Sequence, residues 1–338
     1  MGLGHRIAQT LLNRSFALGV LSMAVLPLSS RAAVLLDDSW ADGSRAESNL
    51  PTESAVHAGI SSTSTPPSSI ATTTGKISLT QGSSSSKIWT YYTSNASAPN
   101  GLQPHNSVTS LGVGDKLTAS ISFTIPSAIV SNVSSAPRNF RFGVFFDPTD
   151  SRVQTDVNSD GGGGTNPWTD ATGYGVLIPL NSNPTNSTSL FQIGKRTTSN
   201  SSLLGSTGAY TLASSGGAPL GAQSNTPYTM QLVLDRISAG QLDVTARMLS
   251  GATLLSTQTV SDLGTSFGGA NIGAGLLPGS QSVYTNFDQL FFRLSGNTEI
   301  SQVDFTNFKI ELASVPEPAS LAVLMCALLL AGPRRRQD

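Results

Sequence analysis

Glutamates that could cleave a glycosidic bond are scarce between residues 33 and 314. Such a reaction requires two carboxyl groups, one on each side of the bond. The segment has only four glutamates: Glu47, Glu53, Glu299 and Glu311. Asp288 and Asp304 are aspartates that could form a pair, although nothing in the sequence brings them together. We therefore expect a protein that is not an enzyme, with a glycan-active enzyme as the alternative.

Cysteine and histidine are also rare. His57 and His105 lie in polar sequence, so we expect both at the surface and no Ser-His-Asp triad. The only cysteine of the chain, Cys326, lies in an apolar stretch near the C-terminus. Residues 33–314 therefore have no cysteine nucleophile, and they can form neither a disulfide nor a zinc–thiolate site.

One short segment matches the first half of a calcium-binding loop. Asp156, Asn158 and Asp160 alternate along the chain and are followed by Gly161. Alternating oxygen ligands and a glycine that permits a sharp turn are what such a loop requires. The second half does not match, because Pro167 stands where a bidentate glutamate is needed. Calcium is the only cofactor that the sequence suggests, and an ordinary turn without metal is the alternative.

Three aromatic residues are candidates for contact with a carbohydrate. Trp89 and Tyr91 lie two residues apart, so on a strand they share one face, while Tyr92 points to the other. Trp168 lies in a loop rich in glycine, asparagine and proline, where binding residues often lie, and we expect it to be exposed. The alternative is that these rings are part of the core, which we favour for Trp89.

The elements that must position these residues are β-strands. No stretch keeps an apolar period of 3.6 residues over three turns, and short runs alternate with a period of two. The clearest runs are 76–80, 87–92, 116–125, 139–146, 173–180, 189–196, 228–237, 241–249, 253–260, 289–294 and 303–312. We expect 76–80 to pair with 87–92, 228–237 to form a hairpin with 241–249, and 139–146 to be a central strand. About a dozen strands exceed the seven to nine of an immunoglobulin sandwich.

Composition limits the class of partner. The chain has 338 residues, of which 12% are charged, and its net charge is −1. An average globular protein has about 25% charged residues. A nucleic-acid-binding protein normally has a basic surface, so we expect no nucleic-acid partner.

The N-terminus has the pattern of a secretory signal peptide. His5, Arg6 and Arg14 supply positive charge, and residues 16–28 are mostly apolar. Thirteen helical residues extend about 20 Å, which is too short for a bilayer core of about 30 Å. Small residues at Ser30 and Ala32 fit a cleavage site after Ala32. We therefore assign residues 1–32 to a signal peptide.

The C-terminus joins a helix-breaking motif, an apolar run and a basic end. Pro316, Glu317 and Pro318 lie within the motif 315–320. The apolar stretch 321–332 follows, and the basic tail 333–338 contains Arg334, Arg335 and Arg336. Prolines end the preceding strand, and arginines remain on the cytoplasmic side of a membrane. A plain membrane anchor is the alternative interpretation of these residues.

These C-terminal residues resemble the PEP-CTERM sorting signal. The resemblance rests on the Pro-Glu-Pro triplet, the apolar helix and the terminal arginines, about 24 residues in all. It implies recognition by exosortase, a membrane transpeptidase, after export by the secretion machinery and transient anchoring in the inner membrane. It also implies delivery to the cell envelope, the outer surface or the extracellular matrix, where exopolysaccharide is a partner.

The order of strands between the two ends resembles the concanavalin A-like jelly roll of lectins and laminarinase-type glucanases. The hairpin 228–249, the closing strand 303–310 and the opening segment 37–43 support the resemblance. It implies a single all-β, antiparallel jelly-roll sandwich over residues 33–314, and a pair of fibronectin-like domains is the alternative. The Glu-x-Asp-x-x-Glu motif of the glucanases is absent.

The sequence thus predicts an exported, non-catalytic protein of the cell surface or extracellular matrix that contacts polysaccharide. The alternative is a polysaccharide-active hydrolase or lyase on the same fold.

Overall fold

The computed structural model describes most of the chain between its two ends. The described residues are 32–46, 49–60, 67–82, 85–93, 109–127, 139–147, 152–153, 155–158, 168–180, 182–183, 189–200, 202–205, 207–273, 276–295 and 300–314. Residues Ala32–Val315 form one compact unit. Most of the expected signal peptide and the whole sorting tail lie outside the described residues. No described helix is long and apolar enough to cross a membrane.

Sheet A is the largest β-sheet of the described structure. Its strands are β1 (Ala33–Asp38), β3 (Ser69–Thr73), β4 (Lys76–Thr80), β7 (Lys116–Thr124), β13 (Tyr228–Ser238), β14 (Gln241–Ser250), β15 (Thr253–Asp262), β16 (Ser266–Phe267), β17 (Ala270–Asn271) and β20 (Gln302–Ala313). They lie in the order β17-β16-β15-β14-β13-β7-β20-β4-β3, and β1 also pairs with β20.

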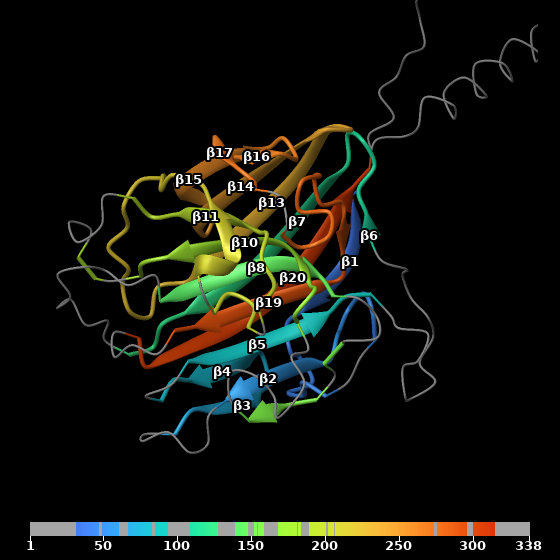
Figure 1. The fold of residues 1–338 in the computed structure, drawn as a ribbon. Helices are drawn as coiled ribbons and strands as arrows, with labels where there is room; N and C mark the ends of the chain where they lie inside the picture. Colours follow the sequence, from blue (N-terminus) through green and yellow to red (C-terminus); the bar gives the residue numbers. More distant parts are fainter. Residues whose placement is uncertain are drawn as a thin grey trace, which may run out of the picture. The chain divides into compact units, whose positions relative to one another are not determined.

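Sheet B lies against it. Its strands are β2 (Val56–Ile60), β5 (Ser86–Tyr91), β8 (Phe140–Phe146), β9 (Val157–Asn158), β10 (Thr172–Ile178), β11 (Gln192–Arg196), β12 (Tyr210–Leu212) and β19 (Gln289–Leu294). Their order is β12-β11-β10-β8-β19-β5-β2-β9, and in Figure 1 they follow one another from β2 near the bottom to β11 near the top. The described pairings are antiparallel except the short one between β2 and β9.

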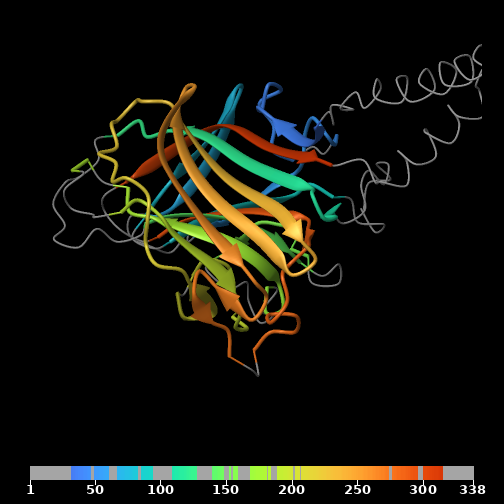
Figure 2. The same cartoon turned by 90° about the horizontal axis from the view of Figure 1, so that it is seen from above.

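Two short strands and one 3-10 helix complete the described structure. Strand β6 (Thr109–Ser110) pairs with β18 (Asn286–Phe287), and the 3-10 helix η3 (Thr207–Ala209) precedes β12. The two layers of the sandwich are seen in Figure 2. The all-β sandwich that the sequence predicts is therefore confirmed for the described residues.

Alternation along each strand explains why the sheets stack. On β7, Leu117, Ala119, Ile121 and Phe123 are buried and belong to the cluster between the sheets. Phe123 of sheet A packs against Phe140 of sheet B, with 4.6 Å between ring centroids. This cluster is continuous from the first strand to the last, so the described segment is not a pair of fibronectin-like domains.

Several expected strands are confirmed and one pairing is wrong. Strands β13 and β14 form the long hairpin, and β8 is central, between β10 and β19. Strands β4 and β5 do not pair with each other: β4 pairs with β3 and β20 in sheet A, whereas β5 pairs with β2 and β19 in sheet B. The backbone N–H of Gln81 donates to the carbonyl of Ser301, so the chain leaves β4 alongside the start of β20 rather than in a tight turn.

Candidate functional site

The outer face of sheet B, which points away from sheet A, carries a second aromatic cluster. Alternation places Ile88 of β5 in the core between the sheets and puts Trp89 and Tyr91 on the opposite face. Phe291 of β19 lies opposite Trp89 in the strand register. We call Trp89, Tyr91, Phe145, Trp168 and Phe291 the outer cluster. The expectation that Tyr92 points the other way is confirmed, since Tyr92 belongs to the core.

The rings of the outer cluster are in direct contact. Trp89 and Trp168 pack edge to face with 5.2 Å between their centroids, and Trp168 lies 5.5 Å from Phe291. Trp89 stacks over Phe291 at 6.1 Å. The indole N–H of Trp89 donates to the carbonyl oxygen of Val153 at 2.8 Å. The ammonium group of Lys87 lies 4.5 Å from the centre of the Trp168 ring, a cation–π contact.

Covering segments exclude solvent from this cluster. Leu203, Leu204 and Tyr210 pack against it. The side chains of Trp89 and Trp168 have no solvent exposure. The expectation that Trp168 is exposed is therefore wrong, whereas the interpretation of Trp89 as a buried ring is confirmed. The sequence pattern could not show the burial of Trp168, because it arises from segments distant in the chain.

Two arginines on the outer face of sheet B bind residues 202–205, which lie over the outer cluster. Arg141 donates to the carbonyl oxygens of Leu204 at 2.6 Å and Gly205 at 2.9 Å. Arg293 donates to the Ser202 hydroxyl at 2.7 Å. Charge-assisted hydrogen bonds of this kind are stronger than neutral ones, so they fix residues 202–205 against the sheet.

Gly175 lets Leu204 pack closely against sheet B. A Cβ atom added to Gly175 of β10 would lie 2.4 Å from Cδ2 of Leu204. A larger residue at position 175 would therefore push Leu204 away from the sheet.

Beside the aromatic rings lies a buried polar cluster of Tyr91, Asp147, Arg152 and Asp288. The Tyr91 hydroxyl donates to Oδ2 of Asp147. Arg152 donates to Oδ2 of Asp288 at 2.7 Å, and the backbone N–H of Asp147 donates to Oδ1 of Asp288 at 2.9 Å. Neither Asp147 nor Asp288 is exposed to solvent.

Burial controls the ionisation of this cluster. Desolvation raises the pKa of Asp288 to about 7, although Arg152 opposes the shift. Burial and the neighbouring Asp147 carboxylate hold the pKa of Tyr91 well above its ordinary value. A carboxyl group with a raised pKa beside a second carboxyl group is the arrangement that an acid–base enzyme uses. Here both groups are already engaged by protein partners.

The structure does not bring Asp288 and Asp304 together. Asp304 lies on β20 of sheet A and forms an ion pair with Lys76 at 2.6 Å. The neighbour of Asp288 is Asp147, which directly follows the central strand β8. The sequence signal for Asp147 was its place at the end of that strand, but only the neighbouring positions of β8 and β19 bring the two aspartates together.

Several polar groups near the outer cluster are buried without a hydrogen-bond partner. They include both side-chain polar atoms of Gln289, the indole N–H of Trp168 and the Nε atoms of Arg152 and Arg196. Gln289 lies opposite both Tyr91 and Phe145 in the sheet register, so its side chain lies on the same face of sheet B as the outer cluster. Buried polar groups are almost always hydrogen-bonded, and unpartnered ones therefore need an explanation.

The expected calcium ligands are only partly described. Asp156 forms an ion pair with Arg45 through its carboxylate and also accepts from the backbone N–H of Ala58 at 2.9 Å. Asn158 lies on β9, and Asp160 lies outside the described residues. Within the described ranges there is no group of three His, Cys, Asp or Glu residues that could hold a metal ion.

The expectation for His57 needs correction. His57 is half-buried on β2, with its ring 5.9 Å from that of Trp89, rather than in a surface loop. Burial lowers its pKa to about 4. His105 lies outside the described residues.

A serine-nucleophile spacing, Gly-x-Ser-x-Gly, occurs at residues 264–268. In an elbow the serine follows a strand and begins a helix. Here Ser266 begins the short strand β16, which pairs with β15 and β17, so the elbow geometry is absent from these described residues.

The structure is similar to several solved structures. They include the Ca2+/Man-bound form of the VIP36 exoplasmic/lumenal domain (11% identity, 85% of this chain and 93% of that chain, TM-score 0.43). Peanut lectin with a 9mer peptide covers 85% of this chain and 100% of its own at 16% identity, with a TM-score of 0.39. An endo-1,3-beta-glucanase from Streptomyces sioyaensis is 10% identical, with 86% of this chain and 100% of the glucanase covered and a TM-score of 0.41.

Comparison of the sequence with known proteins does not assign this chain to a family. No protein family model matches this chain, and no curated protein matches it significantly. The similar solved structures are too distant from this chain to assign it an activity.

Proposed function

We propose that this protein is exported, sorted through its C-terminal tail by exosortase, and delivered to the cell envelope or extracellular matrix. The proposal rests on the charged and apolar N-terminal segment 1–32 and on the motif, apolar run and arginines of residues 315–338. A chain that carries both signals passes through the secretion machinery and is held briefly in the inner membrane before its tail is processed.

At its destination the protein binds polysaccharide without catalysis, through the outer face of sheet B. The observation that carries this role is the unpartnered amide of Gln289, which lies opposite Tyr91 on the face of sheet B that carries the outer cluster. Sugars offer apolar ring faces for aromatic side chains and hydroxyl groups for polar ones. A bound sugar would supply the partners that Gln289 and the Trp168 indole lack. Binding requires Trp168 to move, because its ring now closes the face.

Retention on immobilised polysaccharide tests this role. The probe is exopolysaccharide purified from the host's own cultures, with dextran as an unrelated glucan. We expect the wild-type protein to be retained and Gln289→Leu to lose retention while it stays folded, because leucine removes a buried unpartnered amide. Gln231→Leu is the matched control: Gln231 lies on β13 of sheet A and donates to the Ser120 hydroxyl. Equal retention of all three proteins, or of none, would contradict the role.

A glycan-active hydrolase is the second candidate, and the proximity of Asp147 to Asp288 favours it. Two carboxyl groups, one with a raised pKa, are the minimum that hydrolysis requires. Release of reducing sugar from the host exopolysaccharide distinguishes the two functions. We expect no release; release that disappears in Asp288→Asn would show an enzyme instead.

A further inference from the structure

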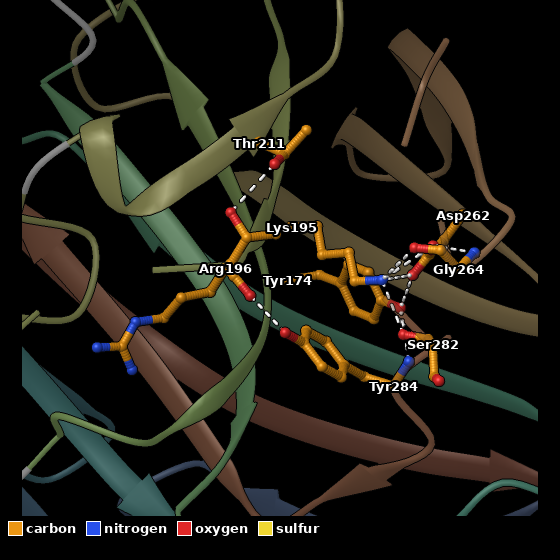
Figure 3. A network of polar contacts seen from close by, with 9 residues as sticks. Tyr174, Lys195, Arg196, Thr211, Asp262, Gly264, Ser282 and Tyr284 are labelled. Atoms are coloured by element: carbon orange, nitrogen blue, oxygen red, sulfur yellow. Dashed lines mark hydrogen bonds and ion pairs between the residues drawn. The ribbon is translucent and has the colours of Figure 1, made fainter. Parts of the chain in front are cut away.

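A lysine and an aspartate are fully buried together between the two sheets. Lys195 lies on β11 of sheet B, and Asp262 ends β15 of sheet A. The Lys195 Nζ atom lies 3.0 Å from Oδ1 and 2.8 Å from Oδ2 of Asp262. Neither side chain is exposed to solvent. Figure 3 shows the two side chains meeting head on, while Arg196 points away from them.

Each remaining polar atom of this pair has a defined partner. The Tyr174 hydroxyl donates to Oδ2 of Asp262. The backbone N–H of Gly264 donates to Oδ1 at 2.8 Å. Lys195 Nζ also donates to the carbonyl oxygen of Ser282 at 2.8 Å. The pair is therefore held in one orientation by Tyr174, Gly264 and Ser282, which come from three separate parts of the chain.

The surroundings of Lys195 and Asp262 disfavour the charged forms of both side chains. Aromatic rings enclose the pair: Lys195 Nζ lies 4.7 Å from the centre of the Tyr284 ring, and Tyr174 packs against Phe267 at 6.0 Å. Burial lowers the pKa of Lys195 and raises the pKa of Asp262, while the attraction between the two groups opposes both shifts. A buried ion pair pays a desolvation penalty that a neutral linkage of the same atoms does not.

We propose that Lys195 and Asp262 join spontaneously in an intramolecular amide bond between Nζ and Cγ. A proton first passes from the ammonium group to the carboxylate, which gives a neutral amine and a neutral carboxylic acid. The nitrogen lone pair attacks Cγ, and Oδ2 leaves as water after it takes a proton through the Tyr174 hydroxyl. That hydroxyl recovers a proton from the nitrogen. One amine and one acid give one amide and one water, so no oxidant or cofactor is needed.

The existing hydrogen bonds suit the product. After Oδ2 leaves, Oδ1 becomes the amide oxygen and still accepts from the N–H of Gly264, which also stabilises negative charge on that oxygen during the attack. The single N–H left on Nζ still donates to the carbonyl of Ser282. A pocket of about 190 Å³ is lined in part by Ser282 and Tyr284, and both of these residues also contact Lys195.

The linkage would tie the two sheets together across the sandwich. Lys195 and Asp262 are 67 residues apart in the chain and belong to different sheets. Residues 33–314 contain no cysteine, so a disulfide cannot supply such a link. A covalent cross-link stabilises a fold chiefly by restricting the unfolded chain, which suits a protein outside the cell.

Mass spectrometry of the purified full chain under denaturing conditions tests the proposal. We expect the intact mass to be lower than that of the unlinked chain by one water molecule. Trypsin cleaves after arginine, so the digest should contain peptide 153–196 joined to peptide 248–293, uncleaved at Lys195. Lys195→Arg should show the unlinked mass. A wild-type chain at the full mass, with the two peptides separate, would overturn the proposal and leave a buried ion pair.

Two variants test the part played by Tyr174. Tyr174→Phe removes the hydroxyl that contacts Asp262, and we expect unlinked chain to accumulate in freshly purified protein. Tyr284→Phe is the matched control, because its hydroxyl donates to the carbonyl of Arg196 and not to the pair. It should link as fully as the wild type. Equal linkage in both variants would contradict the proton relay through Tyr174.

Discussion

The Trp168 ring packs edge to face against the Trp89 ring, with 5.2 Å between their centroids and 81° between their planes. Trp89 belongs to strand β5, whereas Trp168 precedes β10, so the contact fixes a loop against the middle of sheet B. The same contact hides both rings from solvent. Trp168 therefore both stabilises the fold and closes the proposed binding face.

Replacing Trp168 should reduce both the stability of the fold and the binding of polysaccharide. Trp168→Ala removes a fully buried ring, and we expect the free energy of unfolding to fall by about 3–5 kcal/mol. Retention on the host exopolysaccharide should also be lost. Trp168→Phe keeps an aromatic ring and should recover part of both. Urea denaturation and column retention measure the two quantities, and an unchanged unfolding free energy in Trp168→Ala would contradict the packing described.

Asp288 should make stability fall as the pH rises from about 4 to 7. Its pKa in the folded protein is about 7, so in this range the folded chain keeps a proton that the unfolded chain releases. Its stabilising contribution is complete below pH 4 and is lost through pH 7, with a slope of at most about 1.4 kcal/mol per pH unit. Asp38, with a pKa of about 6, acts in the same direction, so the measurement is the difference between wild type and Asp288→Asn. A difference that does not change with pH would be inconsistent with a raised pKa.

His57 should have the opposite effect. Its pKa in the folded protein is about 4, below its ordinary value of 6.5, because burial disfavours the charged ring. The unfolded chain binds a proton at a higher pH than the folded chain, so His57 contributes stability above pH 6.5 that is lost as the pH falls through 4. We expect the wild type to lose more stability than His57→Gln between pH 6.5 and 4. Thermal unfolding at several pH values measures this, and parallel curves would contradict it.

Calcium should have little effect on the described part of the chain. Arg45 already pairs with the Asp156 carboxylate, and a metal would have to displace it. Both side chains are partly exposed, so the pair should contribute less than about 1 kcal/mol. We expect the midpoint of thermal unfolding to be the same in EDTA and in calcium. A rise with calcium that Asp156→Asn abolishes would establish the loop as a calcium site.

Local sequence patterns predict where the strands lie in the chain better than they predict which strands pair. The period of two in residues 87–92 correctly separates Trp89 and Tyr91 from Tyr92, because adjacent residues on a strand face opposite sides. The same pattern says nothing about which sheet a strand joins, so the predicted pairing of β4 with β5 is wrong. Strands β2 and β3 are short and interrupted by polar residues, so the period of two does not identify them.

The candidate site depends on contacts that are distant in sequence. Asp147 and Asp288 are 141 residues apart, and Trp89 meets Trp168 only because loops fold over sheet B. The aromatic residue types indicate a cluster, but exposure is decided by the segments that cover it. The Lys195–Asp262 pair gives no local signal, since each residue lies alone in an otherwise ordinary strand.

The most direct test of the proposed function is the C-terminus of the mature protein in its native host. Tryptic peptides from each cell fraction are analysed by mass spectrometry, and the informative peptide begins at Ile310. We expect it to end near residues 315–318 in the envelope or matrix fraction, and to extend into the tail when exosortase is deleted. A wild-type protein that remains in the membrane fraction and still carries Arg334, Arg335 and Arg336 would contradict sorting through the tail.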